Sequence, residues 1–216
     1  MKIQKAVRIA VACLVAIAIA GSIASAQTLT ITTTVSGTSG PWQWVDGGLN
    51  TGYQYGLGII GAPTVVSAAN GFRFSVGDGL TVSYISGLVD SSKDGDNGYW
   101  DANGDKTFIM NNGNFGWVGP SYYMNPATYP IYLGELVGTF ANNSGQIVGT
   151  PFAVGNLGTF TVPTGATQLQ LGINDTIEDD NLGSFNIQIT GVPEPTSLSL
   201  LAFGMLGIVI LVKYRR

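Results

Sequence analysis

Between residues 168 and 190, apolar and polar residues alternate in two runs on either side of an acidic loop. The apolar positions are Leu169, Leu171 and Ile173 in the first run, and Phe185, Ile187 and Ile189 in the second. A period of two is typical of a β-strand with one buried face. The pattern therefore predicts two half-buried antiparallel strands that form a hairpin.

Shorter runs of β-branched and aromatic residues, separated by turns rich in Gly and Pro, predict further strands at 29–35, 72–76, 80–86, 131–140, 146–154 and 158–162. The turn Gly77-Asp78-Gly79 predicts a hairpin that joins 72–76 to 80–86. No window between 27 and 195 keeps a helical period without a Gly or Pro that interrupts it. The sequence therefore predicts an all-β domain, a β-sandwich or jelly roll, over 27–191.

The N-terminus has the pattern of a secretory signal peptide. Three basic residues precede a long apolar run, and Ala24-Ser25-Ala26 follows it as a small-residue cleavage site. We therefore expect residues 1–26 to be removed. The one cysteine, Cys13, lies within them, so the mature protein is expected to have no disulfide.

The C-terminus contains the apolar run Leu198–Val212, followed by a basic cluster. As a helix it would extend about 23 Å, which is short against a hydrocarbon core of roughly 30 Å. Flanking Ser and Lys side chains can compensate for the difference, so we expect a transmembrane helix. Basic residues at both termini place the termini in the cytoplasm and the acidic domain outside.

Directly before this run stand Pro193, Glu194 and Pro195. Pro-Glu-Pro, a short apolar helix and terminal basic residues together resemble the PEP-CTERM sorting signal, here residues 192–216. The resemblance implies that these three residues are recognised by a membrane-embedded exosortase in a Gram-negative bacterium that makes exopolysaccharide. It also implies an exported protein, first anchored in the cell envelope and released after processing.

The charges limit the function. The stretch 27–195 has three basic and thirteen acidic residues, a net charge of −10, so a nucleic acid partner is excluded. The chain has no histidine, which removes histidine-based catalytic triads and histidine-ligated zinc. A pair of carboxylates remains for glycosidase chemistry, but the acids cluster in loops. We therefore expect a protein that is not an enzyme.

The loop between the two alternating runs contains Asp175, Glu178, Asp179 and Asp180, with no Lys or Arg in the segment. Carboxylates this close repel one another unless a cation or raised pKa values relieve them. Calcium takes six to eight oxygen ligands from such loops, and an extracellular site needs only an affinity of about 10⁻⁴–10⁻³ M. The loop therefore predicts a Ca²⁺ site.

A second acidic stretch, 90–107, lies in the long irregular segment 89–129. It begins like an EF-hand at Asp101, but Lys106 replaces the required Gly and Asn112 the terminal Glu, so it is not an EF-hand. It is either a calcium loop of another kind or a solvated acidic loop. The match of 56–61 to a dinucleotide-binding fingerprint is discarded, because Pro63 interrupts the required helix.

Two segments, LGINDTIEDDNLGSFNIQIT and GDGLTVSYISG, resemble the galactose-binding bacterial lectins of the PA-I type. The resemblance implies a jelly-roll sandwich whose hairpin loop binds a Ca²⁺ ion that bridges two sugar hydroxyls. By this resemblance Asp175 is the first ligand, and Asp180 and Asn181 take the places of two asparagines. Backbone carbonyls near Glu178, and near Asp90 or Ser91, complete the shell.

This sequence departs from those lectins, because its loop is two residues shorter and more acidic, and their sugar-contacting histidine is absent. The resemblance therefore supports the fold and calcium better than galactose.

Aromatic residues in the acidic stretch 90–107 offer a platform on which a sugar ring can stack. Tyr99, Trp100 and Asp101 are the predicted carbohydrate contacts, with packing onto the sandwich as the alternative for Trp100; Trp117 is expected in the core. We expect an exported, calcium-dependent, lectin-like protein that binds carbohydrate at the cell surface or in exopolysaccharide. The alternative is a non-catalytic structural or adhesive matrix protein in which calcium is purely structural.

Overall fold

The alternating runs fold into strands with few helical residues. A computed structural model describes residues 28–45, 48–53, 61–92, 98–109, 130–175 and 177–192. Eleven strands follow one another there: β1 (Leu29–Ser36), β2 (Thr64–Ser67), β3 (Gly79–Asp90), β4 (Tyr99–Trp100), β5 (Asp105–Ile109), β6 (Tyr132–Leu133), β7 (Leu136–Ala141), β8 (Ile147–Ala153), β9 (Leu157–Thr161), β10 (Gln168–Ile173) and β11 (Leu182–Val192). The short 3-10 turns are η1 (Thr51–Tyr53), η2 (Ala68–Asn70) and η3 (Glu178–Asp180). The all-β prediction is confirmed.

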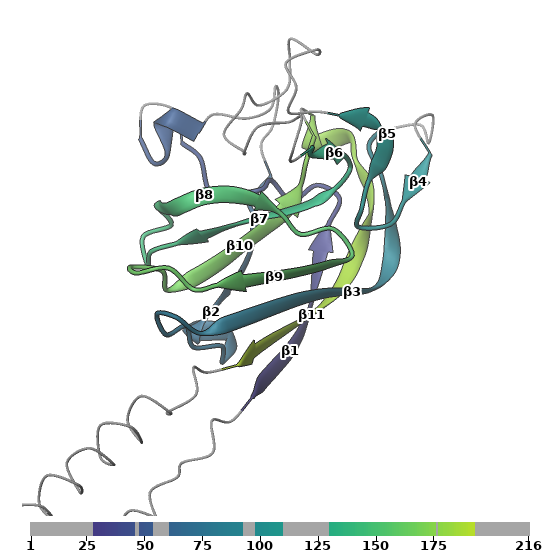
Figure 1. Cartoon of the computed structure of the whole chain (residues 1–216). Helices are drawn as coiled ribbons and strands as arrows, with labels where there is room; N and C mark the ends of the chain where they lie inside the picture. Colours follow the sequence, from purple (N-terminus) through teal and green to yellow (C-terminus); the bar gives the residue numbers. More distant parts are fainter. Residues whose placement is uncertain are drawn as a thin grey trace, which may run out of the picture. The chain divides into compact units, whose positions relative to one another are not determined.

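The strands form two larger sheets and one small one, all antiparallel (Figure 1). The first sheet has the order β1-β11-β3-β4, with β9 beside the first half of β3. The second has the order β2-β10-β7-β8, and β5 pairs with β6. Sequence neighbours therefore often lie in different sheets, and many pairings join distant parts of the chain.

The two larger sheets share one hydrophobic core. The first sheet contributes, among others, Val35, Val82, Phe185, Ile187 and Ile189, and the second Val66, Phe140, Leu169, Leu171 and Ile173. Six of these ten residues are the apolar positions of the period-two pattern: Leu169, Leu171, Ile173, Phe185, Ile187 and Ile189. Burying a large aliphatic or aromatic side chain stabilises a fold by about 1.5–3 kcal/mol, so this shared core holds the two layers together.

The prediction that 168–173 is half-buried is wrong, because all six residues of β10 are buried. The segment before Val45 covers the outer face of this strand. The backbone N–H of Gln43 donates to Oε1 of Gln170 at 2.9 Å. At Gly172 an added Cβ would lie 2.0 Å from the carbonyl oxygen of Gly40, so only glycine permits this approach. Trp42 and Ile131 pack with Val137 in a second small core.

The predicted hairpin between the two alternating runs is also wrong. β10 pairs with β2 and β7, whereas β11 pairs with β1 and β3. The acidic loop therefore connects one sheet to the other. This connection leaves the loop at the end of both layers instead of at a hairpin tip in solvent.

The hairpin predicted around Gly77-Asp78-Gly79 does not form, although its turn does. The backbone N–H of Asp78 donates to the carbonyl of Ser75 at 3.0 Å, and Asp78 Oδ2 accepts from the N–H of Ser75 at 3.1 Å. Residues 72–75 are not in a strand, because Phe72 turns into the core and β3 pairs with β11, β9 and β4 instead. The strand predicted at 131–140 is broken at Gly134 and Glu135 into β6 and β7.

All of the strands belong to one compact unit, Thr28–Pro193. The predicted signal peptide, 1–26, and the predicted membrane helix, 198–212, lie outside the described residues. Within the part of the chain that the structure describes, no helix is long and apolar enough to cross a membrane.

Candidate cation site at the connection from β10 to β11

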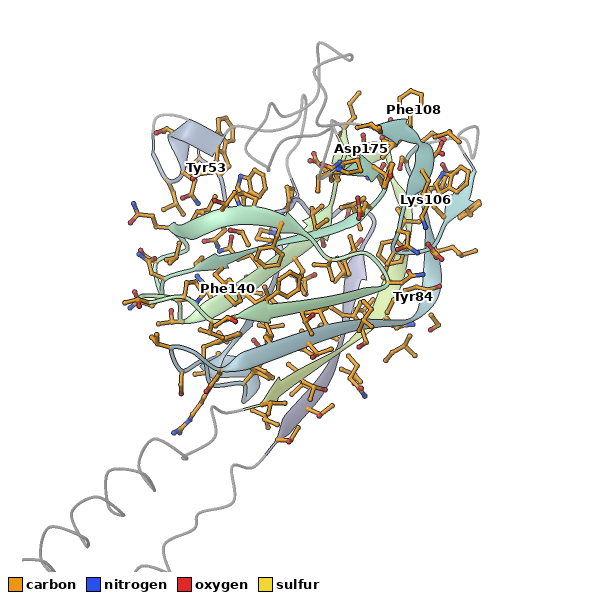
Figure 2. The ribbon with its side chains drawn as sticks, viewed as in Figure 1. Tyr53, Tyr84, Lys106, Phe108, Phe140 and Asp175 are labelled. Atoms are coloured by element: carbon orange, nitrogen blue, oxygen red, sulfur yellow. The ribbon has the colours of Figure 1, made fainter. Side chains whose placement is uncertain are left out.

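Three strand ends meet at the acidic loop. Asp90, the last residue of β3, is directly opposite Leu182, the first residue of β11. β10 ends just before Asn174, whose carbonyl accepts from the N–H of Gly134 at 3.0 Å. A Cβ on Gly134 would lie 2.9 Å from Ser91 Oγ, which brings the chain after β3 to the same place. Figure 2 shows Asp175 at the same end of the sheets as Lys106 and Phe108 of β5.

The loop reverses the usual burial of apolar and charged residues. Ile177 is exposed, whereas the next residue, Glu178, is only 1% exposed. Glu178 begins the short turn η3, and its carbonyl accepts from the N–H of Asn181 at 3.3 Å. Charged residues are almost never fully buried unless they are paired, so this glutamate needs a physical explanation.

Several buried oxygens at this end have no hydrogen-bond donor among the described residues: Glu178 Oε1 and Oε2, Asp90 Oδ2 and Asn181 Oδ1. The other atoms of these side chains are bonded. Asp90 Oδ1 accepts from the N–H and Oγ of Ser92, and Asn181 Nδ2 donates to the carbonyl of Gly37 at 2.9 Å. A buried acceptor without a donor costs about 1–3 kcal/mol, and more when it is charged. Four such oxygens therefore need a cation or another donor.

Burial raises the pKa of Glu178 to about 8. The charges of Asp175, Asp179 and Asp180 contribute to this rise, but less than burial does. The residue's own backbone N–H is near enough to lower this pKa, but its geometry is not that of a hydrogen bond to the carboxylate. A cation would supply the positive charge that this surrounding lacks.

The donor set suits a hard cation. The chain contains no histidine, and the oxygens here are carboxylates, an amide and backbone carbonyls, which are ligands that Ca²⁺ prefers. In the described ranges, no three Asp, Glu, His or Cys side chains are grouped so that they could hold a metal by themselves. A calcium shell at this site would therefore draw on Asn181 Oδ1 and on backbone carbonyls, as calcium loops commonly do.

The five predicted metal ligands thus lie at one end of the molecule. Glu178 and Asn181 are in or next to η3, Asp90 ends β3, and Asp175 and Asp180 are half-buried in the connecting loop. Asp90 was expected to contribute a carbonyl, but its buried carboxylate is the more notable feature.

The predicted carbohydrate contacts lie beside this end. Tyr99 pairs with Asp90, and Trp100 with Val89, so β4 extends the first sheet next to the acidic loop. Tyr99 is 54% exposed, whereas Trp100 is half-buried, with its Cδ1 3.8 Å from where a Cβ on Gly134 would lie. Tyr99 is therefore the more accessible ring. Trp117 lies outside the described residues.

Asp101 is engaged within the protein. It accepts from the N–H of Asn103 at 2.9 Å and from Asn156 Nδ2 at 2.9 Å. Burial raises its pKa, but the hydrogen bonds from Asn156 and Asn103 and the charge of Lys106 lower it more, so the net pKa is below its usual value. Its carboxylate holds the turn between β4 and β5.

Glu135 is a buried acid that the sequence analysis missed. It is 6% exposed, between β6 and β7, and its Oε2 accepts from the N–H of Tyr132 at 2.8 Å. Burial is the dominant effect and raises its pKa to about 8, although the hydrogen bond from Tyr132 and the charge of Lys106 act in the opposite direction. The signal in the sequence was a lone acid within the apolar run 131–140.

Comparison with known proteins identifies the C-terminal segment. Residues 191–216 match the model of the PEP-CTERM protein-sorting motif, which confirms that prediction. The motif indicates export and sorting to the cell envelope, with processing by an exosortase. No curated protein matched the chain.

Among solved structures, the chain is similar to AJLec from the sea anemone Anthopleura japonica. The alignment covers 72% of this chain and 98% of that one, at 15% identity and a TM-score of 0.28. A similarity this low carries no argument about function. The resemblance to PA-I type lectins remains a prediction.

Proposed function

We propose that this protein is an exported, non-catalytic binding module that holds Ca²⁺ at the connection from β10 to β11 and binds carbohydrate through that ion. The observation that carries the proposal is Glu178, a nearly fully buried carboxylate with no hydrogen-bond donor among the described residues. It lies among three other carboxylates that raise its pKa. A divalent cation relieves both the repulsion and the missing hydrogen bonds at once.

The ligands are assigned to Glu178 and Asn181 together with backbone carbonyls of the loop. Asp175, Asp180 and Asp90 are the candidates for one further carboxylate, because no three acidic side chains are grouped among the described residues so that they could hold the ion by themselves. Calcium can bind six to eight oxygens, so a site at the end of a loop retains positions for solvent or sugar hydroxyls. The exposed ring of Tyr99, paired with Asp90, supports a sugar contact next to the ion.

Export supports the proposal because extracellular calcium is high enough to fill a weak site. Anchoring through 198–212 until exosortase processing belongs to the same proposal, as does association with exopolysaccharide.

The test is a thermal unfolding titration of the full chain with calcium, combined with a glycan array run with and without chelator. Millimolar Ca²⁺ should raise Tm, because a ligand that binds only the native state stabilises it by mass action. Asp175→Asn together with Asp180→Asn should abolish this rise, whereas Asp179→Asn should retain it. Asp179 is the matched control, since its side chain is in the same loop and exposed.

An unchanged Tm at millimolar calcium would exclude the ion site. A rise in Tm without calcium-dependent glycan signals would instead support the second hypothesis, a matrix or adhesive protein with structural calcium. The burial of Glu178 is the observation that favours this second hypothesis, because an ion bound by a buried carboxylate is less accessible to a sugar.

A further inference from the structure

The outward face of the first sheet carries hydroxyl and amide side chains, and its strands also expose the apolar residues Ile85, Leu88, Leu157 and Val192. Because the alternate residues of β1 and β11 enter the core, register places Thr30 opposite Thr190 and Thr34 opposite Asn186 on the outside. Their side chains are hydrogen-bonded: Thr30 Oγ1 and Thr190 Oγ1 are 3.2 Å apart, and Thr34 Oγ1 donates to Asn186 Oδ1 at 2.9 Å. Asn186 Nδ2 donates to Ser86 Oγ of β3 at 3.2 Å. We call the outward positions of β1, β11, β3 and β9 the hydroxyl face.

The hydroxyl face has no ionisable side chain. β1, β9 and β11 contain no Asp, Glu, Lys or Arg, and the one such residue of β3 is Asp90, which is buried at its end. The stretch 27–195 has a net charge of −10, from three basic and thirteen acidic residues, so the acids are concentrated elsewhere. A partner on this face is therefore not selected by charge.

The face contains an open depression of about 320 Å³ where β3 meets β9. Its lining combines three threonines with glycine and apolar residues: Gly79, Leu80, Thr81, Thr159, Phe160, Thr161 and Val192. The nearest atom to a Cβ on Gly79 would be the carbonyl oxygen of Val192, at 3.7 Å, so the missing side chain leaves space. The volume is at the small end of the range for ligand pockets, about 300–1,000 Å³.

The chemistry of the face limits its partner. Each threonine hydroxyl donates one hydrogen bond and accepts up to two, so a partner must offer both kinds of group. An apolar partner would bury these hydroxyls without hydrogen bonds, at a cost. A second copy of this domain would bring two strongly acidic molecules together, which their net charge opposes. A neutral polysaccharide has a suitable set of donors and acceptors and no charge.

The arrangement also suits a polymer. Outward side chains repeat about every 6.6–6.8 Å along a strand, and neighbouring strands are about 4.7–4.9 Å apart, so hydroxyls are presented in rows. The side chains of Ile85 and Leu88 of β3 and Leu157 of β9 are exposed and can contact the apolar C–H faces of sugar rings. We propose that the hydroxyl face binds a neutral polysaccharide without calcium, with one sugar unit in the depression lined by Thr81, Thr159 and Thr161.

The depression in this surface is separate from the cation site. β11 runs eleven residues from Leu182, next to the cation site, to Val192, next to the depression. At about 3.3 Å per residue the two sites are roughly 30 Å apart. The inference therefore stands without the proposed calcium site, although both assign carbohydrate as the partner.

The test is affinity electrophoresis of the full chain in gels that contain hydroxyethyl cellulose, dextran or the anionic polysaccharide alginate, all with EDTA. We expect retardation by at least one neutral polymer and none by alginate. The triple variant Thr81→Val, Thr159→Val, Thr161→Val keeps the side-chain shape and β-branching but removes the hydroxyls. It should weaken retardation at least fivefold. Thr150→Val with Thr167→Val, two exposed threonines outside the face, should leave it unchanged.

Unchanged retardation of the triple variant overturns the proposal, as does a lack of retardation by both neutral polymers. Sedimentation that shows a dimer abolished by the same triple variant would assign the face to a second copy and overturn it as well. Asp175→Asn with Asp180→Asn should not affect retardation in EDTA. A failure of the calcium site and a failure of the hydroxyl face therefore give different results.

Discussion

Glu135 and Glu178 are both almost fully buried, and burial raises the pKa of each to about 8. Their surroundings differ. Glu135 accepts a hydrogen bond from the N–H of Tyr132, and the positive charge of Lys106 stabilises its carboxylate. Glu178 has no donor among the described residues, and its neighbouring charges are three aspartates.

The difference shows that burial alone does not identify a binding site. The protein stabilises Glu135 with its own groups, so this residue is explained by the turn between β6 and β7 that it holds. Glu178 is left without internal compensation, which is the condition expected at a site completed by a ligand. We therefore place the proposed cation at Glu178 and not at Glu135.

The largest expected effect concerns the pH dependence of Glu135. In chelator, its raised pKa means that between about pH 4.5 and 8 the native state keeps a proton that the unfolded state loses. Stability should therefore fall as pH rises through this range and level off above it. Glu135→Gln should remove up to about 1.4 kcal/mol of this fall per pH unit. Urea unfolding at pH 5, 6.5 and 8 measures the free energy of unfolding, and parallel profiles for the variant and the wild type would contradict the prediction.

The next effect separates the two glutamates by calcium. At a calcium concentration of 100 times Kd, the wild type should gain about 2.7 kcal/mol, or roughly 5–10 °C in Tm for a domain of this size. Glu178→Gln should lose most of this gain, because it removes a ligand charge. Glu135→Gln serves as the matched control and should keep it. Equal calcium-induced rises in Tm in the two variants would contradict the prediction that Glu178, and not Glu135, is a calcium ligand.

The smallest expected effect concerns the compensation of Glu135 by Lys106. Because Lys106 is exposed, its interaction with Glu135 is screened by water, so Lys106→Met should cost less than about 0.5 kcal/mol at pH 8. The cost should disappear in 1 M salt and in the Glu135→Gln background. A double-mutant cycle by urea unfolding measures it, and a cost that persists with Gln at 135 would show that Lys106 acts through other contacts.

The candidate site could be predicted from the sequence to a large extent. The acids of the loop are adjacent in the chain, so their mutual repulsion was visible without a fold. The contribution of Asp90 depended on pairing between residues 92 positions apart, opposite Leu182, and only the lectin resemblance suggested it. Glu135 was missed because an isolated acid in an apolar run does not indicate how its charge is compensated.

The hydroxyl face could not be predicted, because it needs the register of four strands from distant parts of the chain. The distance in space between the acidic loop and the sorting motif could not be predicted either. Asn181 and Val192 are close in sequence, but an extended strand separates them by roughly 35 Å. The acidic site and the start of the sorting motif are therefore at opposite ends of β11.

The sequence by itself determined the all-β class, the core-facing residues of β10 and β11, the acidic loop and the sorting motif, because each depends on local periodicity or on adjacent residues. The tertiary structure alone decided which strands pair and which faces are covered. Gln170 and Gln188 occupy equivalent polar positions in the two alternating runs, yet one is fully buried beneath Gln43 and the other is exposed. The alternation of apolar and polar residues along a strand predicts one buried face. Whether the other face is exposed to water depends on chain segments whose position local periodicity does not determine.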